Sequence, residues 1–278
     1  MFNITCPAAA RVVRHAALLS LVLAGAATQA TVIYSNLPSP LPGNLDSLAY
    51  ESTLTTELGD HIAFAAGPRK LNSVTVSMSD WALASTYGSS DPGYQHDLTF
   101  NIYNYTGDSA AGPLIASKTV NAFIPWRPVA DSVNCTGLDA GKWYSTSENH
   151  CWNGLAFNVD FDFSALGVVL PNDIVFGLSF NTRGYGKQPI GVAGPYDLLN
   201  YAFTAAAPSV GTDIDPDSLF WNTAYPGQST AGIFRVNTGN AGYVPIASFD
   251  ASTVPEPASL ALFGLAFAGL AVSRRRKG

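Results

Sequence analysis

Positively charged residues are scarce in this sequence, and they are unevenly placed. Only 14 of the 278 residues are Lys or Arg, and six of these lie within residues 1–30 and 254–278. The 223 residues between those ends carry eight Lys and Arg against 19 Asp and Glu, so their net charge is −11. Because nucleic-acid phosphates require clustered cations, this composition argues against a nucleic-acid partner.

Motifs of the common hydrolases and nucleotide-binding enzymes are also missing. The chain has no His-Glu-x-x-His, no Gly-x-Ser-x-Gly and no Gly-rich phosphate loop, and His61, His96 and His150 are far apart in sequence. We therefore expect a protein that is not an enzyme and that needs no cofactor. A glycan hydrolase stays open as an alternative, because its paired carboxylates meet only in the fold.

No segment of residues 31–253 shows a sustained helical period or an internal repeat. Large apolar residues alternate with polar ones instead, as in Phe157, Val159, Phe161 and Phe163. The expected strands cover residues 31–34, 62–65, 74–78, 98–103, 114–120, 157–163, 176–180, 198–203 and 233–236. Short strands separated by Gly, Pro and Asn turns predict an all-β domain over residues 31–253, an antiparallel β-sandwich of jelly-roll type.

The N-terminal residues have the pattern of a secretory signal. Arg11 and Arg14 precede a short apolar stretch at residues 16–27, which is followed by a small-residue site ending at Ala30. This order predicts a signal helix within a signal peptide, residues 1–30, that is cleaved after Ala30.

The C-terminal residues have the pattern of a membrane tail. Residues 258–272 are apolar and uncharged, and a basic cluster follows, made of Arg274, Arg275, Arg276 and Lys277. We predict a transmembrane helix at 258–272 with the basic cluster as a cytoplasmic stop. Its 15 residues span about 22 Å against a hydrocarbon core of about 30 Å, so we expect a brief anchor.

Val254, Pro255, Glu256 and Pro257 stand immediately before this apolar run. The Pro-Glu-Pro turn, the Gly- and Ala-rich segment and the terminal Arg cluster together resemble the PEP-CTERM sorting signal of Gram-negative bacteria. The same tail is also named an ice-binding protein C-terminal domain, which is no evidence of ice binding. The resemblance covers residues 254–278 and implies that a membrane-embedded exosortase cuts near the motif and passes the body to the cell surface or the exopolysaccharide matrix.

A second resemblance concerns the body. Residues 98–105, 112–117, 157–163 and 170–181 are similar to the choice-of-anchor domains that accompany such tails. The similarity implies an extracellular β-sandwich and names no activity.

Two cysteines are left once the signal peptide is removed, Cys135 and Cys151. A pair in an oxidising compartment predicts a disulfide, which would close the polar, Gly-rich stretch at 136–150, expected to be a long loop. A metal site made of these cysteines and His150 is the alternative, although further ligands at zinc spacing are missing.

Carboxylates are densest at Asp213, Asp215 and Asp217. Alternate acids in an extended loop can direct oxygens at one point, which suits Ca²⁺, and a solvated acidic turn is the alternative.

We therefore expect an exported structural or interaction protein of the cell surface or extracellular matrix, tethered in the cell envelope by its tail. A carbohydrate-binding module, with exopolysaccharide as partner and calcium as a possible aid, is the alternative function. Aromatic residues that could stack on sugars are Trp81, Tyr87, Tyr94, Trp126, Trp143, Tyr144, Trp152, Tyr185, Tyr196, Trp221 and Tyr225.

Overall fold

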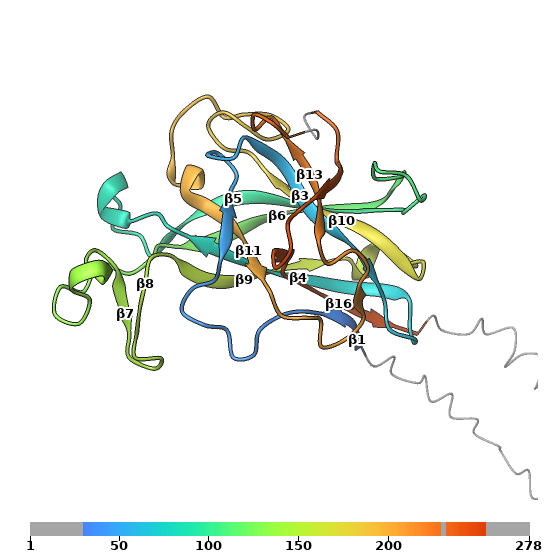
Figure 1. Ribbon diagram of the computed structural model, residues 1–278, viewed down its shortest axis with the longest axis horizontal. Helices are drawn as coiled ribbons and strands as arrows, with labels where there is room; N and C mark the ends of the chain where they lie inside the picture. The colour runs from blue at the N-terminus through green and yellow to red at the C-terminus, as the bar shows by residue number, and fades with distance from the viewer. Residues whose placement is uncertain (1–29, 229–231, 254–278) are drawn as a thin grey trace, which may run out of the picture.

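The computed structural model describes residues 30–228 and 232–253, and within them antiparallel strands dominate (Figure 1). Two seven-stranded sheets and one two-stranded hairpin are present in this part of the chain. The all-β prediction is therefore confirmed. The jelly-roll topology is not confirmed by the strand orders.

The first sheet has the order β1-β16-β4-β11-β15, with β2 paired to β11 and β9 paired to β4. Its strands are β1 (Thr31–Ser35), β2 (Ser47–Ala49), β4 (Lys70–Asp80), β9 (Leu155–Asp162), β11 (Leu199–Thr204), β15 (Val244–Pro245) and β16 (Ala247–Ser252).

The second sheet has the order β14-β13-β3-β10-β5-β6, with β12 paired to β3. Its strands are β3 (Thr55–Ala63), β5 (Gly93–Tyr103), β6 (Leu114–Pro125), β10 (Asp173–Phe180), β12 (Thr212–Asp213), β13 (Ser218–Thr223) and β14 (Arg235–Thr238).

Short 3-10 turns connect some of these strands. They are η1 (Ala84–Tyr87), η2 (Gly137–Asp139), η3 (Ser164–Leu166) and η4 (Pro195–Leu198). No helix in residues 30–228 and 232–253 has the length and apolar character to cross a bilayer. The helices predicted within residues 1–30 and at 258–272 fall almost wholly outside the described residues.

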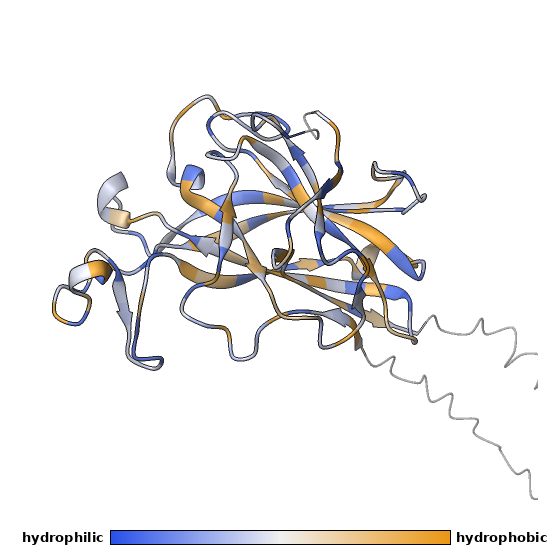
Figure 2. Ribbon diagram, viewed as in Figure 1, coloured by the Kyte–Doolittle hydropathy of each residue, from blue (hydrophilic) through white to orange (hydrophobic). Residues whose placement is uncertain are grey.

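Aromatic side chains from both sheets meet in the core between them. The ring of Phe100 on β5 lies 5.4 Å from Phe161 on β9, 5.6 Å from Phe176 on β10 and 5.8 Å from Phe249 on β16, measured between centroids. All four rings are fully buried. Figure 2 shows hydrophobic and hydrophilic residues mixed along the strands, as expected where one face of each sheet is buried.

The first and last strands of the body pair with each other. β16 lies between β1 and β4, and Thr31 is opposite Ala251. Both ends of the described chain therefore leave from the same region, as Figure 1 shows where the two grey traces begin. The predicted cleavage site after Ala30 and the tail both adjoin this strand pair.

The predicted disulfide is present between Cys135 and Cys151. The expectation of a long loop between them is wrong in part, because β7 (Trp143–Ser145) pairs with β8 (His150–Trp152) to form a hairpin. Trp143 is 8% exposed and donates its indole N–H to the carbonyl of Gly154 at 2.7 Å, which fixes the hairpin to the body.

Replacing both Cys135 and Cys151 by alanine is expected to lower the free energy of unfolding by about 3 kcal/mol, because the disulfide closes a loop of about 15 residues in the unfolded chain. Urea unfolding monitored by tryptophan fluorescence measures this change. An unfolding midpoint equal to that of the parent protein would contradict the prediction.

A buried carboxyl group at the end of β4 makes stability depend on pH. Asp80 is fully buried; its Oδ1 accepts from the Tyr94 hydroxyl at 3.1 Å, and its Oδ2 has no partner within the described chain. Burial raises the pKa of Asp80 to about 7 from 3.8, although the bond from Tyr94 opposes this shift. The native state therefore holds this proton at pH values at which the unfolded chain has lost it.

Because of Asp80, the free energy of unfolding should fall as the pH rises from about 4 to about 7, by at most about 4 kcal/mol. Over this range the unfolded chain has lost the Asp80 proton and the native state still holds it. Asp80→Asn removes this contribution, so its stability should fall less than that of the parent over the same range. Urea unfolding at pH 4, 5.5 and 7 tests this difference. Parallel pH profiles of the two proteins would show that the account of Asp80 is wrong.

Candidate functional site

A polar groove of about 540 Å³ crosses the outer face of the second sheet. Residues of β3, β10, β5 and β6 form its floor, and part of the loop at residues 181–198 lines it as a wall. We term it the sheet groove. Its polar lining includes Glu57, Asp97, Asn101, Ser117, Lys187 and Gln188.

The two-residue period of the strands explains why this surface is polar. Leu98, Phe100 and Ile102 of β5 are fully buried in the core. The residues between them, Thr99 and Asn101, consequently point outward and line the groove. The same alternation that builds the core therefore builds the groove floor.

Glu57 on β3 is a largely buried carboxylate at this floor, only 9% exposed. Its Oε1 accepts from the Asn101 amide at 2.8 Å and from the Tyr103 hydroxyl at 2.9 Å, both on β5. To reach them, the Glu57 side chain crosses β10 at Gly177, where an added Cβ would collide with Oε1. Glycine is therefore required at position 177 for this carboxylate to lie along the sheet.

The carboxylate of Glu57 is not fully compensated. Burial raises its pKa above 4.5, and the bonds from Asn101 and Tyr103 only partly oppose that shift. All its hydrogen bonds within residues 30–228 and 232–253 use Oε1. Oε2 has no such bond, yet it is not among the atoms sealed from solvent, so it is open to the groove.

Hydrogen bonds between neighbouring strands hold the other floor residues in place. The Ser117 hydroxyl donates to the side-chain Oδ1 of Asn101 at 2.7 Å, and the hydroxyls of Thr99 and Thr119 are 2.8 Å apart. Asn101 thus connects β6 to Glu57 on β3. The floor therefore contains a hydrogen-bonded chain from Ser117 through Asn101 to Glu57 and a separate Thr99–Thr119 pair.

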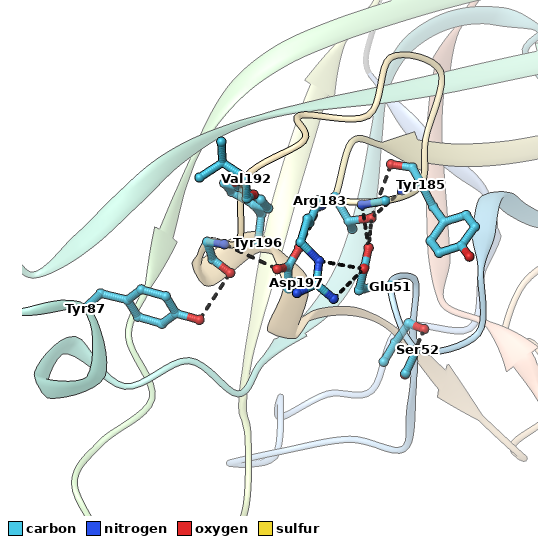
Figure 3. Close-up of polar contacts among 12 residues, drawn as sticks. Glu51, Ser52, Tyr87, Arg183, Tyr185, Val192, Tyr196 and Asp197 are labelled. Atoms are coloured by element: carbon cyan, nitrogen blue, oxygen red, sulfur yellow. Dashed lines mark hydrogen bonds and ion pairs between the residues drawn. The ribbon is translucent and has the colours of Figure 1, made fainter.

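Two carboxylates fix the loop that forms the wall of the groove (Figure 3). Glu51 accepts from the Thr182 hydroxyl at 2.7 Å, from the Gly184 amide at 2.9 Å and from the Arg183 guanidinium at 3.0 and 3.2 Å. Asp197 accepts from the amide of Arg183 at 2.8 Å. Burial tends to raise the pKa of Glu51, but these donors outweigh it and lower that pKa.

A second groove, of about 590 Å³, has tryptophan side chains in its lining. Trp81, 39% exposed, and Trp152 of the disulfide hairpin both line it, together with Asn44 and Asp46. We term it the tryptophan groove. Of the aromatic residues named from the sequence, it brings these two together, whereas Trp143 and Trp221 are buried in the body.

The acidic loop does not form a shared ligand set. The Oδ1 of Asp213 accepts from the backbone amide of Asp215, whose Oδ2 in turn lies 3.4 Å from His61 Nδ1. No group of three or more His, Cys, Asp or Glu residues that could hold a metal occurs among the described residues. Calcium binding by Asp213, Asp215 and Asp217 stays a prediction without support in this geometry.

His61 is a buried histidine whose two ring nitrogens face carboxylates. Its Nε2 lies 3.3 Å from Asp173, on the opposite side from Asp215, and its ring stacks on Tyr105 at 3.7 Å. With both nitrogens facing acids, neither is directed at open solvent. Both ring nitrogens of His61 are therefore engaged by carboxylates of the protein itself.

Comparison with family models decides what the tail is. Residues 253–277 match the model described as the PEP-CTERM protein-sorting motif. The chain carries a PEP-CTERM sorting motif. The match contains Val254, Pro255, Glu256 and Pro257 as well as the basic cluster at 274–277, all of which lie outside the described residues.

The PEP-CTERM motif points to an exported protein associated with the cell envelope, and motifs of this kind are recognised by exosortases. Comparison with curated proteins and with solved structures gave no match.

Sequence reasoning missed the sheet groove. Glu57 and Asn101 are 44 residues apart, and no local pattern connects them. One available indication was Gly177 inside a strand of large apolar residues, since a glycine there often marks the close approach of another group.

Glu51→Ala should loosen the groove wall without unfolding the sandwich, because it removes the acceptor of Thr182, Arg183 and Gly184. Hydrogen exchange at the amide of Gly184 should accelerate at least about tenfold, while the core of β10 keeps its protection. Asp91→Ala, which removes an exposed carboxylate elsewhere, is the matched control. Unchanged exchange at Gly184 would contradict the assigned role of Glu51.

Proposed function

We propose that this protein is a non-enzymatic structural or interaction protein of the cell surface or extracellular matrix. Its tail tethers it in the membrane until an exosortase cuts near Pro255 and Pro257. The observation that carries the proposal is the sorting motif at residues 253–277, which starts one residue after β16 ends at Ser252. The tail therefore follows the folded body directly.

The positions of the ends support processing of a finished body. Cleavage after Ala30 and near Pro255 would remove no residue of β1 or β16. Pro255 and Pro257 disfavour a helix around Glu256, which suits an extended segment that a protease can bind. The disulfide between Cys135 and Cys151 is in keeping with an oxidising, exported location.

The histidines support the non-enzymatic part of the proposal. Both ring nitrogens of His61 face carboxylates. His96 is 9% exposed, and its Nε2 lies 2.8 Å from the backbone carbonyl oxygen of Asn181. Burial lowers the pKa of His96. A nitrogen of each ring is thus held by groups of the protein itself, whereas His150 is exposed and lines the tryptophan groove.

Carbohydrate binding is the second candidate function. Two open grooves with polar side chains favour it, one over the second sheet and one lined by Trp81 and Trp152. A glycan hydrolase is the third candidate, and release of reducing sugar would identify it.

Intact-mass analysis of the protein recovered from the native envelope and culture medium tests the proposal. We expect a body that begins at Thr31, ends near residues 254–257 and lacks two hydrogens at Cys135 and Cys151. A variant truncated after Thr253 should appear in the medium without passing through the membrane fraction. Recovery of the parent chain from the medium with residues 258–278 still attached would contradict the processing step.

A further inference from the structure

We propose that the sheet groove binds a neutral oligosaccharide and that Glu57 accepts hydrogen bonds from its hydroxyl groups. This inference deepens the proposed function by naming a ligand class and its site. It rests on the proposed function in one respect: the protein must be exported to meet an extracellular oligosaccharide.

The position of Glu57 indicates that the ligand carries groups that donate hydrogen bonds to this carboxylate. The Glu57 residue is only 9% exposed, and the two donors on Oε1 leave Oε2 without a hydrogen bond within the described chain. Asp80 also has an unpaired oxygen, but that oxygen is sealed from solvent, whereas Oε2 of Glu57 faces the groove and can be reached by a ligand. A ligand hydroxyl at Oε2 would complete its hydrogen bonding.

The charges around the groove select the class of ligand. Glu57 and Asp97 line it together with one cation, Lys187, and the body carries a net charge of −11. Uronic acids and other anionic chains are disfavoured by this surface. Neutral sugars offer hydroxyls that donate to Glu57 and Asp97 and accept from Lys187 and Gln188.

The shape of the groove suits a short chain. It crosses four neighbouring strands, β3, β10, β5 and β6, whose spacing of about 4.8 Å gives the floor a width of about 14 Å. It is an open surface channel, so an oligosaccharide can enter from the side and extend beyond either end.

The polar groups of the groove are held in place before a ligand arrives. Ser117 and Asn101 are hydrogen-bonded across the floor, and Glu51 and Asp197 fix the loop that presents Lys187 and Gln188 (Figure 3). A site with fixed side chains loses less conformational entropy on binding. This preorganisation distinguishes the groove from an ordinary solvated sheet face.

The test uses the full-length chain, purified in mild detergent, on an array of neutral glucan, mannan, galactan and N-acetylglucosamine oligomers, with uronic-acid oligomers and spermine as charged probes. We expect binding to at least one neutral series. Glu57→Gln should weaken it by about tenfold or more, the factor set by losing a charged hydrogen bond.

Two control variants separate this site from the rest of the surface. Asp160→Asn makes the same chemical change at an exposed carboxylate on the outer face of the first sheet, and it should leave binding unchanged. Trp81→Ala changes the tryptophan groove and should also leave oligosaccharide binding unchanged. Loss of binding with Trp81→Ala and not with Glu57→Gln would move the site and overturn the proposal.

Stability separates a ligand-binding role of Glu57 from a structural one. Since burial raises the pKa of Glu57, its ionised form destabilises the fold above about pH 4.5, so Glu57→Gln should unfold at the same or a higher temperature at pH 7. A variant with weaker binding and undiminished stability fits only a functional carboxylate. A variant that unfolds at a lower temperature contradicts the proposal.

Other outcomes on the array are equally decisive. Binding to spermine alone, to uronic acids alone or to none of the probes would overturn the proposal, whatever the mass analysis shows about export. Conversely, neutral-glycan binding that depends on Glu57 would stand even if the tail proved to be uncut.

Discussion

The insertion of β16 between β1 and β4 is the interaction on which the rest of the structure depends. It is the last strand of the body, yet it lies inside the first sheet and supplies Phe249 to the aromatic core. The first sheet cannot be completed until residues 247–252 are available. The pairing of β1 with β16 connects residues more than 200 positions apart, and contacts of such long range form slowly.

The same strand pairing also places the two ends of the body on a different sheet from the sheet groove. β1 and β16 carry the two ends and belong to the first sheet, whereas the sheet groove lies on the outer face of the second. Because the sheets pack face to face, their outer faces point in opposite directions. A body held by its C-terminal tail therefore presents the groove on the layer that the tail does not join.

Local patterns in the sequence were enough to predict the strand character, the disulfide and the sorting tail. The alternation at residues 157–163 places Val159 and Phe161 in the core and leaves Asp160 and Asp162 exposed, as expected. By contrast, β16 was missed because Ala, Ser and Asp surround its single large residue, Phe249, and give no clear period. Its strand form comes from pairing on both sides and not from local preference.

The candidate site was less predictable than the fold because it depends on contacts between distant strands. Asp213, Asp215 and Asp217 are dense in sequence, but the backbone amide of Asp215 and the ring of His61 take up two of these carboxylates. Glu57 stands alone in sequence and becomes notable only when Gly177 lets it reach Asn101. The density of carboxylates along the sequence therefore does not predict which carboxylate lies half-paired at the floor of a groove.

The most direct test of this account compares thermal unfolding of residues 31–253 with that of the full-length chain. If β1 and β16 close the sandwich on their own, the isolated body should unfold in one cooperative transition at the midpoint of the full-length protein, and further removal of residues 247–253 should abolish that transition. An isolated body without a cooperative transition, or one that tolerates loss of β16, would contradict the claim that pairing of the two ends completes the fold.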